Sequence, residues 1–268
     1  MAAGSELPDD LIARGFTLPP PKIILANISP GTIRTRMASG VLDAVLTGTA
    51  GYGCAFVESG PYLDQARNRA VATCLSTPSW EWMVFVDSDI EFTAAHLRTL
   101  LLPTRHVDYL PEYHPIIGGV YVNPYPDDGI PGEEDDEPGS HLGPVACEWL
   151  LRDDLDGMKL NAPPVFAFRR LSRSALDDLP GVDAEWNLES RVTQVAAVGT
   201  GFMAIHRSLL NTFANMFPPP TAWFDEPVVN TVHLGEDYAF CHRATSLGYP
   251  VLVNRACHVM HHHTLQLI

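Results

Sequence analysis

Positive charge is scarce in this chain, and long apolar runs are missing altogether. Lys and Arg together number 17 against 32 Asp and Glu, which gives a formal net charge of −15. An acidic surface repels phosphate backbones and anionic lipid headgroups, so nucleic-acid binding is disfavoured as a main function. No apolar stretch approaches the roughly 20 residues that a spanning helix needs. We therefore expect a protein with no membrane span and with partners other than nucleic acid.

Paired cysteines and a targeting signal are also missing. The five cysteines are odd in number and no two lie close together in the chain. They are Cys54, Cys74, Cys147, Cys241 and Cys257. This spacing predicts free thiols in a reducing compartment and argues against a cysteine-based zinc site. Residues 1–21 have neither the basic start nor the apolar centre of a signal peptide, so we expect a cytoplasmic location.

What is present is an alternation of short apolar runs and helix-periodic segments, which predicts an α/β fold. Such strand–helix units build a right-handed, mostly parallel central sheet flanked by helices. The length of 268 residues fits one large domain, which we place at 22–268 after a proline-ending lead-in at 1–21. The expected strands are 22–28, 52–57, 82–86, 116–122, 202–205 and 251–253. The expected helices are about 33–46, 62–75, 93–102, 207–215 and 238–247.

One long segment, 124–143, interrupts this alternation. It combines Pro and Gly with the acidic block Glu133–Glu137 and is longer than most structural connections. We expect a solvated, flexible loop there, which serves either as a lid over a site or simply as a surface insertion. The remaining part, 144–268, forms the second half of the domain.

The central motif of the sequence is Asp87-Ser88-Asp89, directly after the apolar run 82–86. In open α/β sheets, ligands bind at the carboxyl ends of the strands. Two carboxylates at such a place repel each other unless a cation neutralises them. A divalent metal that carries phosphate oxygens would do so, because hard cations prefer oxygen ligands. The alternative is an Asp-rich turn that caps the helix expected near Thr93.

Two further groups of polar residues lie in the second half of the chain. Glu236 and Asp237 open an expected helix, where the helix dipole alone would also favour acidic side chains. Four histidines lie near the C-terminus, interleaved with apolar residues unlike a purification tag. They are His258, His261, His262 and His263.

Taken together, these motifs resemble the GT-A class of nucleotide-sugar-dependent glycosyltransferases, particularly the family 2-like group, over about residues 22–263. The segments that carry the resemblance are Ala66–Arg69, Phe85–Asp89, Pro115–Gly119, Val198–Met203 and Gly235–Cys241. Two departures from the family pattern stand out. The first strand ends in Ser29-Pro30-Gly31 rather than in the turn of many relatives, and the region 124–191 matches nothing in the family.

The resemblance implies a metal-dependent enzyme that moves a sugar from a UDP- or GDP-sugar to a hydroxyl of a protein, a glycan or another acceptor. It implies that Asp89 ligates Mn²⁺ or Mg²⁺, and that Asp87 contacts the ribose or the water shell of the metal. A late histidine would complete the metal site. Its distance from the preceding strand favours His261, with His258 and His263 as the alternatives.

The resemblance implies that 144–268 is the acceptor and metal-site half of the domain, and it also implies roles for residues farther from the metal. Asp237 would be the base that deprotonates the acceptor hydroxyl, and Glu236 would bind the acceptor or the donor sugar. Arg67 would contact the nucleotide phosphates, although an exposed helix arginine is the structural alternative.

Four more residues are expected to line the nucleotide-sugar site. Ser29 and Glu58 would flank the base and ribose, Ser88 would lie between the two aspartates, and Gly201 would let the backbone approach the sugar closely. Both the inverting and the retaining outcome stay open.

Three other functions are compatible with parts of this pattern. A haloacid-dehalogenase-like phosphatase also has Asp-x-Asp after a buried strand, but position 91 is Glu and Lys159 is the only lysine after the motif. A nucleotidyltransferase would need a more glycine-rich loop after its first strand. A catalytically inactive GT-A module would bind ligand without turnover, although the four carboxylates at 87, 89, 236 and 237 are all present.

Overall fold

The computed structural model describes residues 22–102, 114–121, 146–149, 168–170, 176, 179, 192–217, 223–229 and 232–262, and the statements below refer to these. The lead-in at 1–21 and the acidic segment 124–143 lie outside the described residues, as do parts of 144–268. Within the described ranges, every helix is too short or too polar to cross a lipid bilayer.

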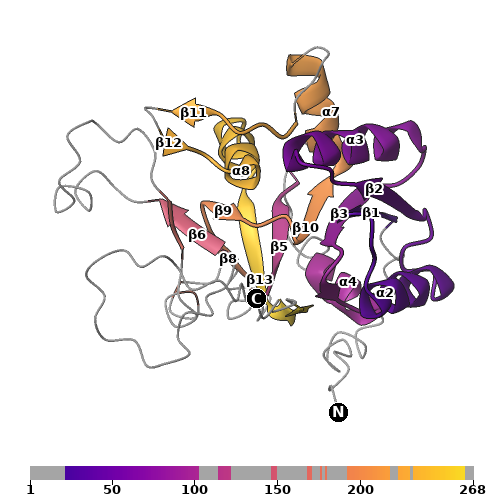
Figure 1. The fold of residues 1–268 in the computed structure, drawn as a ribbon. Coiled ribbons are helices and arrows are strands. Elements are labelled where there is room, and N and C mark those ends of the chain that lie inside the picture. The colour runs from indigo at the N-terminus through magenta and orange to yellow at the C-terminus, as the bar shows by residue number, and fades with distance from the viewer. Residues whose placement is uncertain are drawn as a thin grey trace, which may run out of the picture.

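A seven-stranded sheet forms the centre of the molecule (Figure 1). In spatial order its strands are β2 (Cys54–Glu58), β1 (Ile23–Ser29), β3 (Trp82–Asp87), β10 (Phe202–His206), β5 (Ile116–Val120), β13 (Val251–His258) and β8 (Val192–Gln194). The pairings show that β2, β1, β3, β5 and β13 run in one direction, while β10 and β8 run in the other. The expected α/β class is confirmed, and the sheet is mixed because β10 lies antiparallel between β3 and β5.

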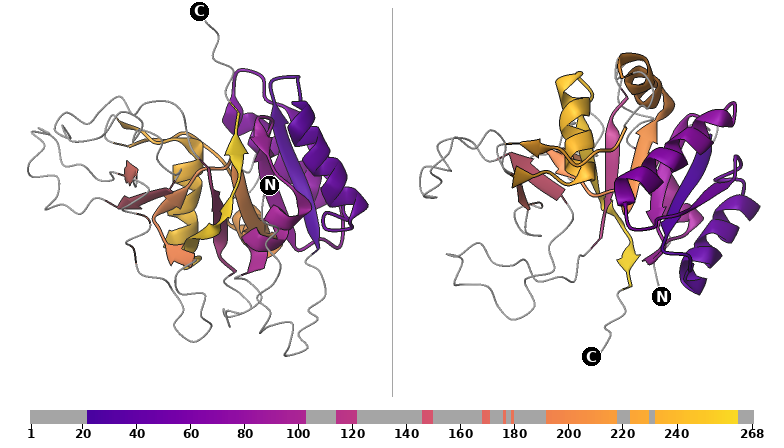
Figure 2. Two further views of the ribbon diagram at one scale, coloured as in Figure 1. Left: turned by 90° about the horizontal axis from the view of Figure 1, so that it is seen from below. Right: turned by 45° about the horizontal axis from the view of Figure 1, so that its top comes forward.

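Helices cover both faces of this sheet. In Figure 1, α3 (Leu63–Ser76), α7 (Arg207–Met216) and α8 (Glu236–Ser246) lie above it, and α2 (Thr35–Leu46) and α4 (Ala94–Leu101) lie below. Figure 2 shows the same two layers from other directions. Each layer has its own hydrophobic core, one with α3, α7 and α8 and the other with α2 and α4.

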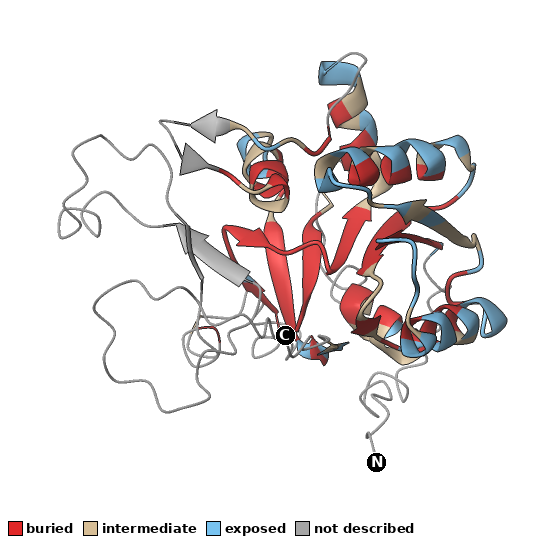
Figure 3. Ribbon diagram, viewed as in Figure 1, coloured by how far each residue is buried: buried red, intermediate tan, exposed pale blue. Residues whose placement is uncertain are grey.

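Strand β3 explains why the apolar run at 82–86 has no polar residue. Met83 and Phe85 point into the core with α3, whereas Val84 and Val86 point into the core with α2 and α4. A strand that is buried on both faces is typically a nearly continuous apolar run. The inner strands are accordingly buried along most of their length (Figure 3).

Three small sheets lie outside the central one. Strand β4 (Ile90–Glu91) pairs with β14 (Met260–His261), β6 (Ala146–Trp149) pairs with β7 (Phe168–Arg170) and with β9 (Ala197–Val198), and β11 (Val228–Val229) pairs with β12 (Val232–His233). The pairing of β4 with β14 is the important one here, because it brings the end of the chain back to the Asp-Ser-Asp motif.

The expected elements agree with the structure to within about two residues, with one exception. Strand β13 was expected to end at Val253 but continues to His258. The sequence turns polar at Asn254 and Arg255, yet both side chains are buried. Asn254 donates a hydrogen bond to the carbonyl of Thr99, and Arg255 donates to the carbonyl of Leu176. These distant partners compensate the polar groups, so the strand runs on.

Candidate active site

The site residues gather at the edge of the sheet where the five strands of common direction end. Ser29 ends β1, Glu58 ends β2 and Asp87 ends β3. In the ladders, Ser29 lies beside Glu58, and Asp87 lies beside Ile28. The antiparallel strand β10 begins at this same edge, just after Gly201. Its orientation therefore adds the Gly199–Gly201 turn to the site.

Charged groups from four parts of the chain surround the Asp87 carboxylate. Burial raises the pKa of Asp87, and the Arg67 guanidinium opposes this rise. The carboxylates of Asp89 and Asp237 raise the pKa of Asp87 further, while His261 lowers it. The backbone N–H of Asp87 donates to the carbonyl of Gly201 at 3.0 Å. Asp87 is therefore a half-buried acid whose charge depends on nearby cations.

The second aspartate of the motif meets the C-terminal strand. Asp89 Oδ2 lies 3.1 Å from His261 Nε2, and both side chains are largely buried. The ladder between β4 and β14 places His261 opposite Ile90, and the backbone N–H of His262 donates to the carbonyl of Asp89 at 2.9 Å. Backbone pairing thus fixes which histidine side chain reaches the aspartate.

The other histidines of the cluster are placed elsewhere. His258 is exposed, and His263 lies outside the described residues. His262 Nε2 lies 2.7 Å from Glu91, to which Arg36 also donates at 2.8 Å. Hydrogen bonds from these two partners lower the pKa of Glu91. This outer cluster holds β14 onto β4.

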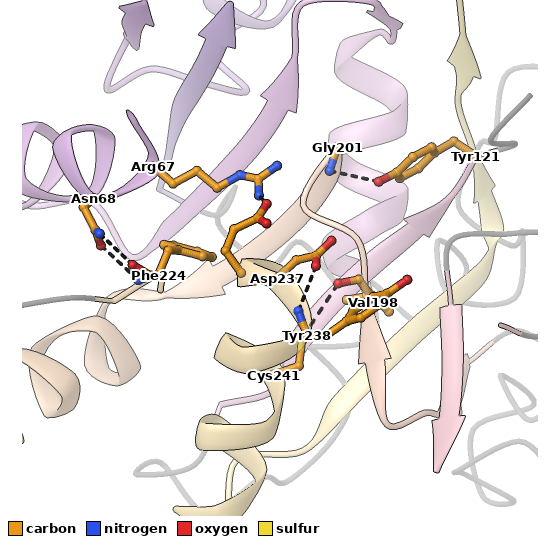
Figure 4. A network of polar contacts seen from close by, with 10 residues as sticks. Arg67, Asn68, Tyr121, Val198, Gly201, Phe224, Asp237, Tyr238 and Cys241 are labelled. Carbon is orange, nitrogen blue, oxygen red and sulfur yellow. Dashed lines mark hydrogen bonds and ion pairs between the residues drawn. The ribbon is translucent and has the colours of Figure 1, made fainter. Parts of the chain in front are cut away.

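Arg67 and Glu236 form a buried ion pair between α3 and the start of α8. Arg67 is 3% exposed and Glu236 is 8% exposed. Figure 4 shows the Arg67 side chain extending toward the start of α8, where Asp237 follows. The Arg67 Nε–H has no hydrogen-bond acceptor among the described residues. Arg67 is therefore not an exposed helix arginine, and its buried Nε–H has no protein partner among the described residues.

Asp237 lies half-buried at the first turn of α8. Its Oδ1 accepts a hydrogen bond from the backbone N–H of Tyr238 at 2.8 Å (Figure 4). A Cβ at Gly235 would lie 3.2 Å from this oxygen, so the glycine leaves room for the carboxylate. At the start of α8, Glu236 thus pairs with Arg67, and Asp237 lies near Asp87.

The remaining expected residues occupy the rim. The buried Ser29 hydroxyl accepts from the N–H of Gly31 at 3.2 Å, and Glu58 is exposed at the end of β2. Ser88 is half-buried between the two aspartates. Asp89 lies on the wall of a cavity of about 430 Å³ between the start of α2 and β4, and Glu58 lines another of about 410 Å³.

One residue beside the site, Tyr121, was not predicted from the sequence, and a second, Asn68, was named only as part of the segment Ala66–Arg69. The phenol oxygen of Tyr121, which follows β5, accepts a hydrogen bond from Gly201 N–H at 2.9 Å. Asn68, next to Arg67, makes two hydrogen bonds to the backbone of Phe224, at 2.7 and 2.9 Å. A polar residue on the inner side of an amphipathic helix could have indicated Asn68. The only signal for Tyr121 was its place near the carboxyl end of the expected strand 116–122.

The donor atoms of Asp89 and His261 suit a metal ion that binds together with a phosphate ligand. Among the described residues, no group of three His, Cys, Asp or Glu side chains could enclose a cation. Asp89 and His261 supply two donors 3.1 Å apart. Adjacent donors of an octahedral ion with bonds of about 2.1 Å are themselves about 3.0 Å apart. Mg²⁺ and similar ions commonly take only one or two protein ligands and fill the rest with water and phosphate.

Comparisons with known proteins give information about the fold. No family model matches the sequence, and no curated protein does. Among solved structures, the chain is similar to A197 from STIV, with a TM-score of 0.50 and 11% identity over 91% of this chain and 86% of that one. It is also similar to GalNAc-T7 crystallised with UDP, GalNAc and Mn²⁺, with a TM-score of 0.51 and 11% identity. That match covers 91% of this chain, which spans 44% of the GalNAc-T7 chain. The likeness shows a GT-A-like fold.

Proposed function

We propose that this chain is a metal-dependent glycosyltransferase, which moves a sugar from a nucleoside-diphosphate sugar to an acceptor hydroxyl. The observation that carries the proposal is the approach of Asp89 to His261, 3.1 Å apart at the ligand-binding edge of the sheet. Asp87, Asp237 and the Arg67–Glu236 pair lie around them. A GT-A-like fold shared with a protein crystallised with UDP, GalNAc and Mn²⁺ supports the same assignment.

Asp89 and His261 would hold the cation, Mn²⁺ or Mg²⁺, and the mixed oxygen and imidazole donors favour Mn²⁺. When bound, the cation would act as a Lewis acid that stabilises negative charge on the departing diphosphate. Asp87 would contact the ribose or the metal's water. The buried Nε–H of Arg67 would donate to a phosphate oxygen, which gives this unpaired donor a partner.

Asp237 is the proposed base. Its carboxylate is fixed by the Tyr238 N–H at one oxygen and lies close enough to Asp87 to raise the pKa of that group. A carboxylate at the sugar side of the site could accept the proton of the attacking hydroxyl. Glu236 would hold Arg67 in place, in addition to any contact with the acceptor or the donor sugar. The proposed acceptor is a hydroxyl of a protein, a glycan or another compound, and the proposed location is the cytoplasm.

Ligand-induced thermal stabilisation tests the proposal. We expect UDP or GDP to raise the melting temperature only when Mn²⁺ or Mg²⁺ is also present. A ligand at 100 times its Kd stabilises by about 2.7 kcal/mol, which corresponds to roughly 5–10 °C for a domain of this size. If neither nucleotide shifts the transition with either metal, the transferase assignment fails.

Variants separate the proposed roles. Asp89→Ala should remove the metal-dependent shift, whereas Asp237→Asn should keep the shift and remove turnover of the donor. Glu81→Gln is the matched control, because Glu81 precedes β3 at the opposite end from Asp87 and should change neither readout. Hydrolysis of a generic phosphate ester would instead favour a phosphatase, and nucleotide binding without any donor turnover would indicate an inactive binding module.

A further inference from the structure

Tyr121 is a buried residue at the candidate site that the proposed chemistry does not use. It directly follows β5 and is 6% exposed. Its hydroxyl and its ring contact two different parts of the site, Gly201 and His261. The two contacts have separate consequences.

The hydroxyl is the first link in a chain of hydrogen bonds that leads to Asp87. Its oxygen accepts from the N–H of Gly201 at 2.9 Å, and the carbonyl of Gly201 accepts from the N–H of Asp87 at 3.0 Å (Figure 4 shows the first link). A Cβ at position 201 would lie 2.6 Å from the Tyr121 oxygen. Only glycine therefore allows this close approach, and the phenol holds the N–H of the residue whose carbonyl accepts from Asp87.

The ring of Tyr121 contacts the imidazole of His261. The ring centroids are 5.5 Å apart, and the planes are nearly perpendicular at 86°. Edge-to-face contacts of this kind favour one relative orientation of the two rings. The N–H of Val259 donates to the carbonyl of Val120 at 3.0 Å, so the backbones on either side are also tied together. The ring is therefore placed to set the plane of His261 as it faces Asp89.

The phenol keeps its proton in this position. Burial raises the pKa of Tyr121, and the carboxylates of Asp87 and Asp237 raise it further. The hydroxyl therefore stays protonated throughout the neutral pH range.

We propose that Tyr121 is a positioning residue of the donor site. Its ring orients the imidazole of His261, and its hydroxyl, through Gly201, positions Asp87. This inference rests on the proposed function, because it assigns His261 and Asp87 to a site for a metal ion and a diphosphate. Residues that orient a metal ligand commonly change metal affinity by about 10- to 100-fold when they are removed.

Two substitutions separate the ring from the hydroxyl. Tyr121→Phe keeps the ring, and Tyr121→Leu removes it. Mn²⁺ binding is measured with UDP present, from the electron paramagnetic resonance signal of free Mn²⁺. We expect Tyr121→Leu to weaken Mn²⁺ binding about tenfold or more, and Tyr121→Phe to stay within about threefold of wild type because the ring contact remains. Tyr121→Met serves as a second ring-free variant if the Leu variant does not unfold cooperatively.

The hydroxyl is tested without metal, by amide hydrogen exchange of Gly201 and Asp87. Tyr121→Phe should accelerate exchange at both amides, because the Gly201 N–H loses its acceptor and Gly201, whose carbonyl accepts from the Asp87 N–H, is held less firmly. Tyr249→Phe is the matched control for both measurements. It removes another buried tyrosine hydroxyl, which bonds Thr212 at 3.0 Å and lies outside the site, and it should change neither readout.

The outcomes distinguish this inference from the proposed function. If the wild-type protein binds no Mn²⁺ with UDP or GDP, the transferase assignment fails and this inference fails with it. If wild type binds but the ring-free variants bind equally well, only the role of the ring is refuted. Equal losses in Tyr121→Phe and Tyr121→Leu would also refute it. Unchanged exchange at Gly201 in Tyr121→Phe would refute the role of the hydroxyl.

Discussion

The buried ion pair between Arg67 and Glu236 gives a prediction whose size can be worked out from the structure. Glu236→Gln keeps the shape of the side chain but leaves the Arg67 charge, which is 3% exposed, without its partner. Breaking a buried pair from one side typically costs about 3–5 kcal/mol. We expect a loss near the lower end, about 3 kcal/mol, because the Asp87 carboxylate still faces Arg67.

The assay is equilibrium unfolding in urea without ligands, which reports the free energy of unfolding of each variant. The control is Glu81→Gln, which removes an ion pair with Lys22 in which both side chains are about half exposed. That change should cost less than about 1 kcal/mol. The double variant Arg67→Met/Glu236→Leu removes both charges, so it should be far less destabilised than the sum of its single variants.

The reasoning is refuted if Glu236→Gln costs no more than the Glu81→Gln control. It is also refuted if the double variant loses as much stability as the two single variants added together. Either result would mean that the Arg67 charge reaches water or another anion in the folded protein.

Three further predictions concern the packing at Gly40, the pH dependence of stability, and the hydrogen bonds from Asn68 to the Phe224 backbone. Gly40→Ala should cost about 2 kcal/mol in urea unfolding despite the helix preference for Ala, because its Cβ would lie 2.4 Å from the Phe92 carbonyl oxygen. Burial lowers the pKa of His206 to about 3. The unfolded chain therefore binds more protons below about pH 6.5, and the melting temperature should fall as pH is lowered from there toward 3. His206→Asn should flatten this profile while still capping its helix. Asn68→Ala should cost about 2 kcal/mol by leaving the Phe224 backbone unpaired.

Control variants at comparable positions test whether the predicted effects are specific to these contacts. Gly51→Ala meets nothing closer than 3.4 Å and should be nearly neutral. Asn211→Ala changes an exposed helix asparagine and should stay within about 0.5 kcal/mol of wild type. The packing prediction is wrong if Gly40→Ala is as stable as wild type. The pH prediction is wrong if His206→Asn leaves the pH profile unaltered. The role of Asn68 is refuted if Asn68→Ala loses no more stability than Asn211→Ala.

Local pattern was sufficient to predict most elements of the fold and part of the site. The run at 82–86 had to be a strand with two buried faces, and the aspartates that follow it had to lie at a sheet edge. The antiparallel insertion of β10 between β3 and β5 could not be predicted in this way, because the apolar pattern of a strand carries no sign of its direction or neighbours. The continuation of β13 through Asn254 and Arg255 was missed for a related reason, since their partners are remote in sequence.

The sequence by itself determined the α/β class, the order of the strands and helices along the chain, and the presence of carboxylates and imidazoles suited to a hard cation. These properties depend on the spacing of apolar residues and on the chemical type of each side chain, both of which can be read directly from the sequence. The resemblance favoured His261 among the histidines, but only the tertiary structure showed that its side chain meets Asp89, that Arg67 is paired with Glu236, and that Tyr121 reaches Gly201. Each of these contacts depends on how segments far apart in the sequence pack together. For His261, a shift of one residue in the pairing of β14 with β4 would turn the side chain to the other face.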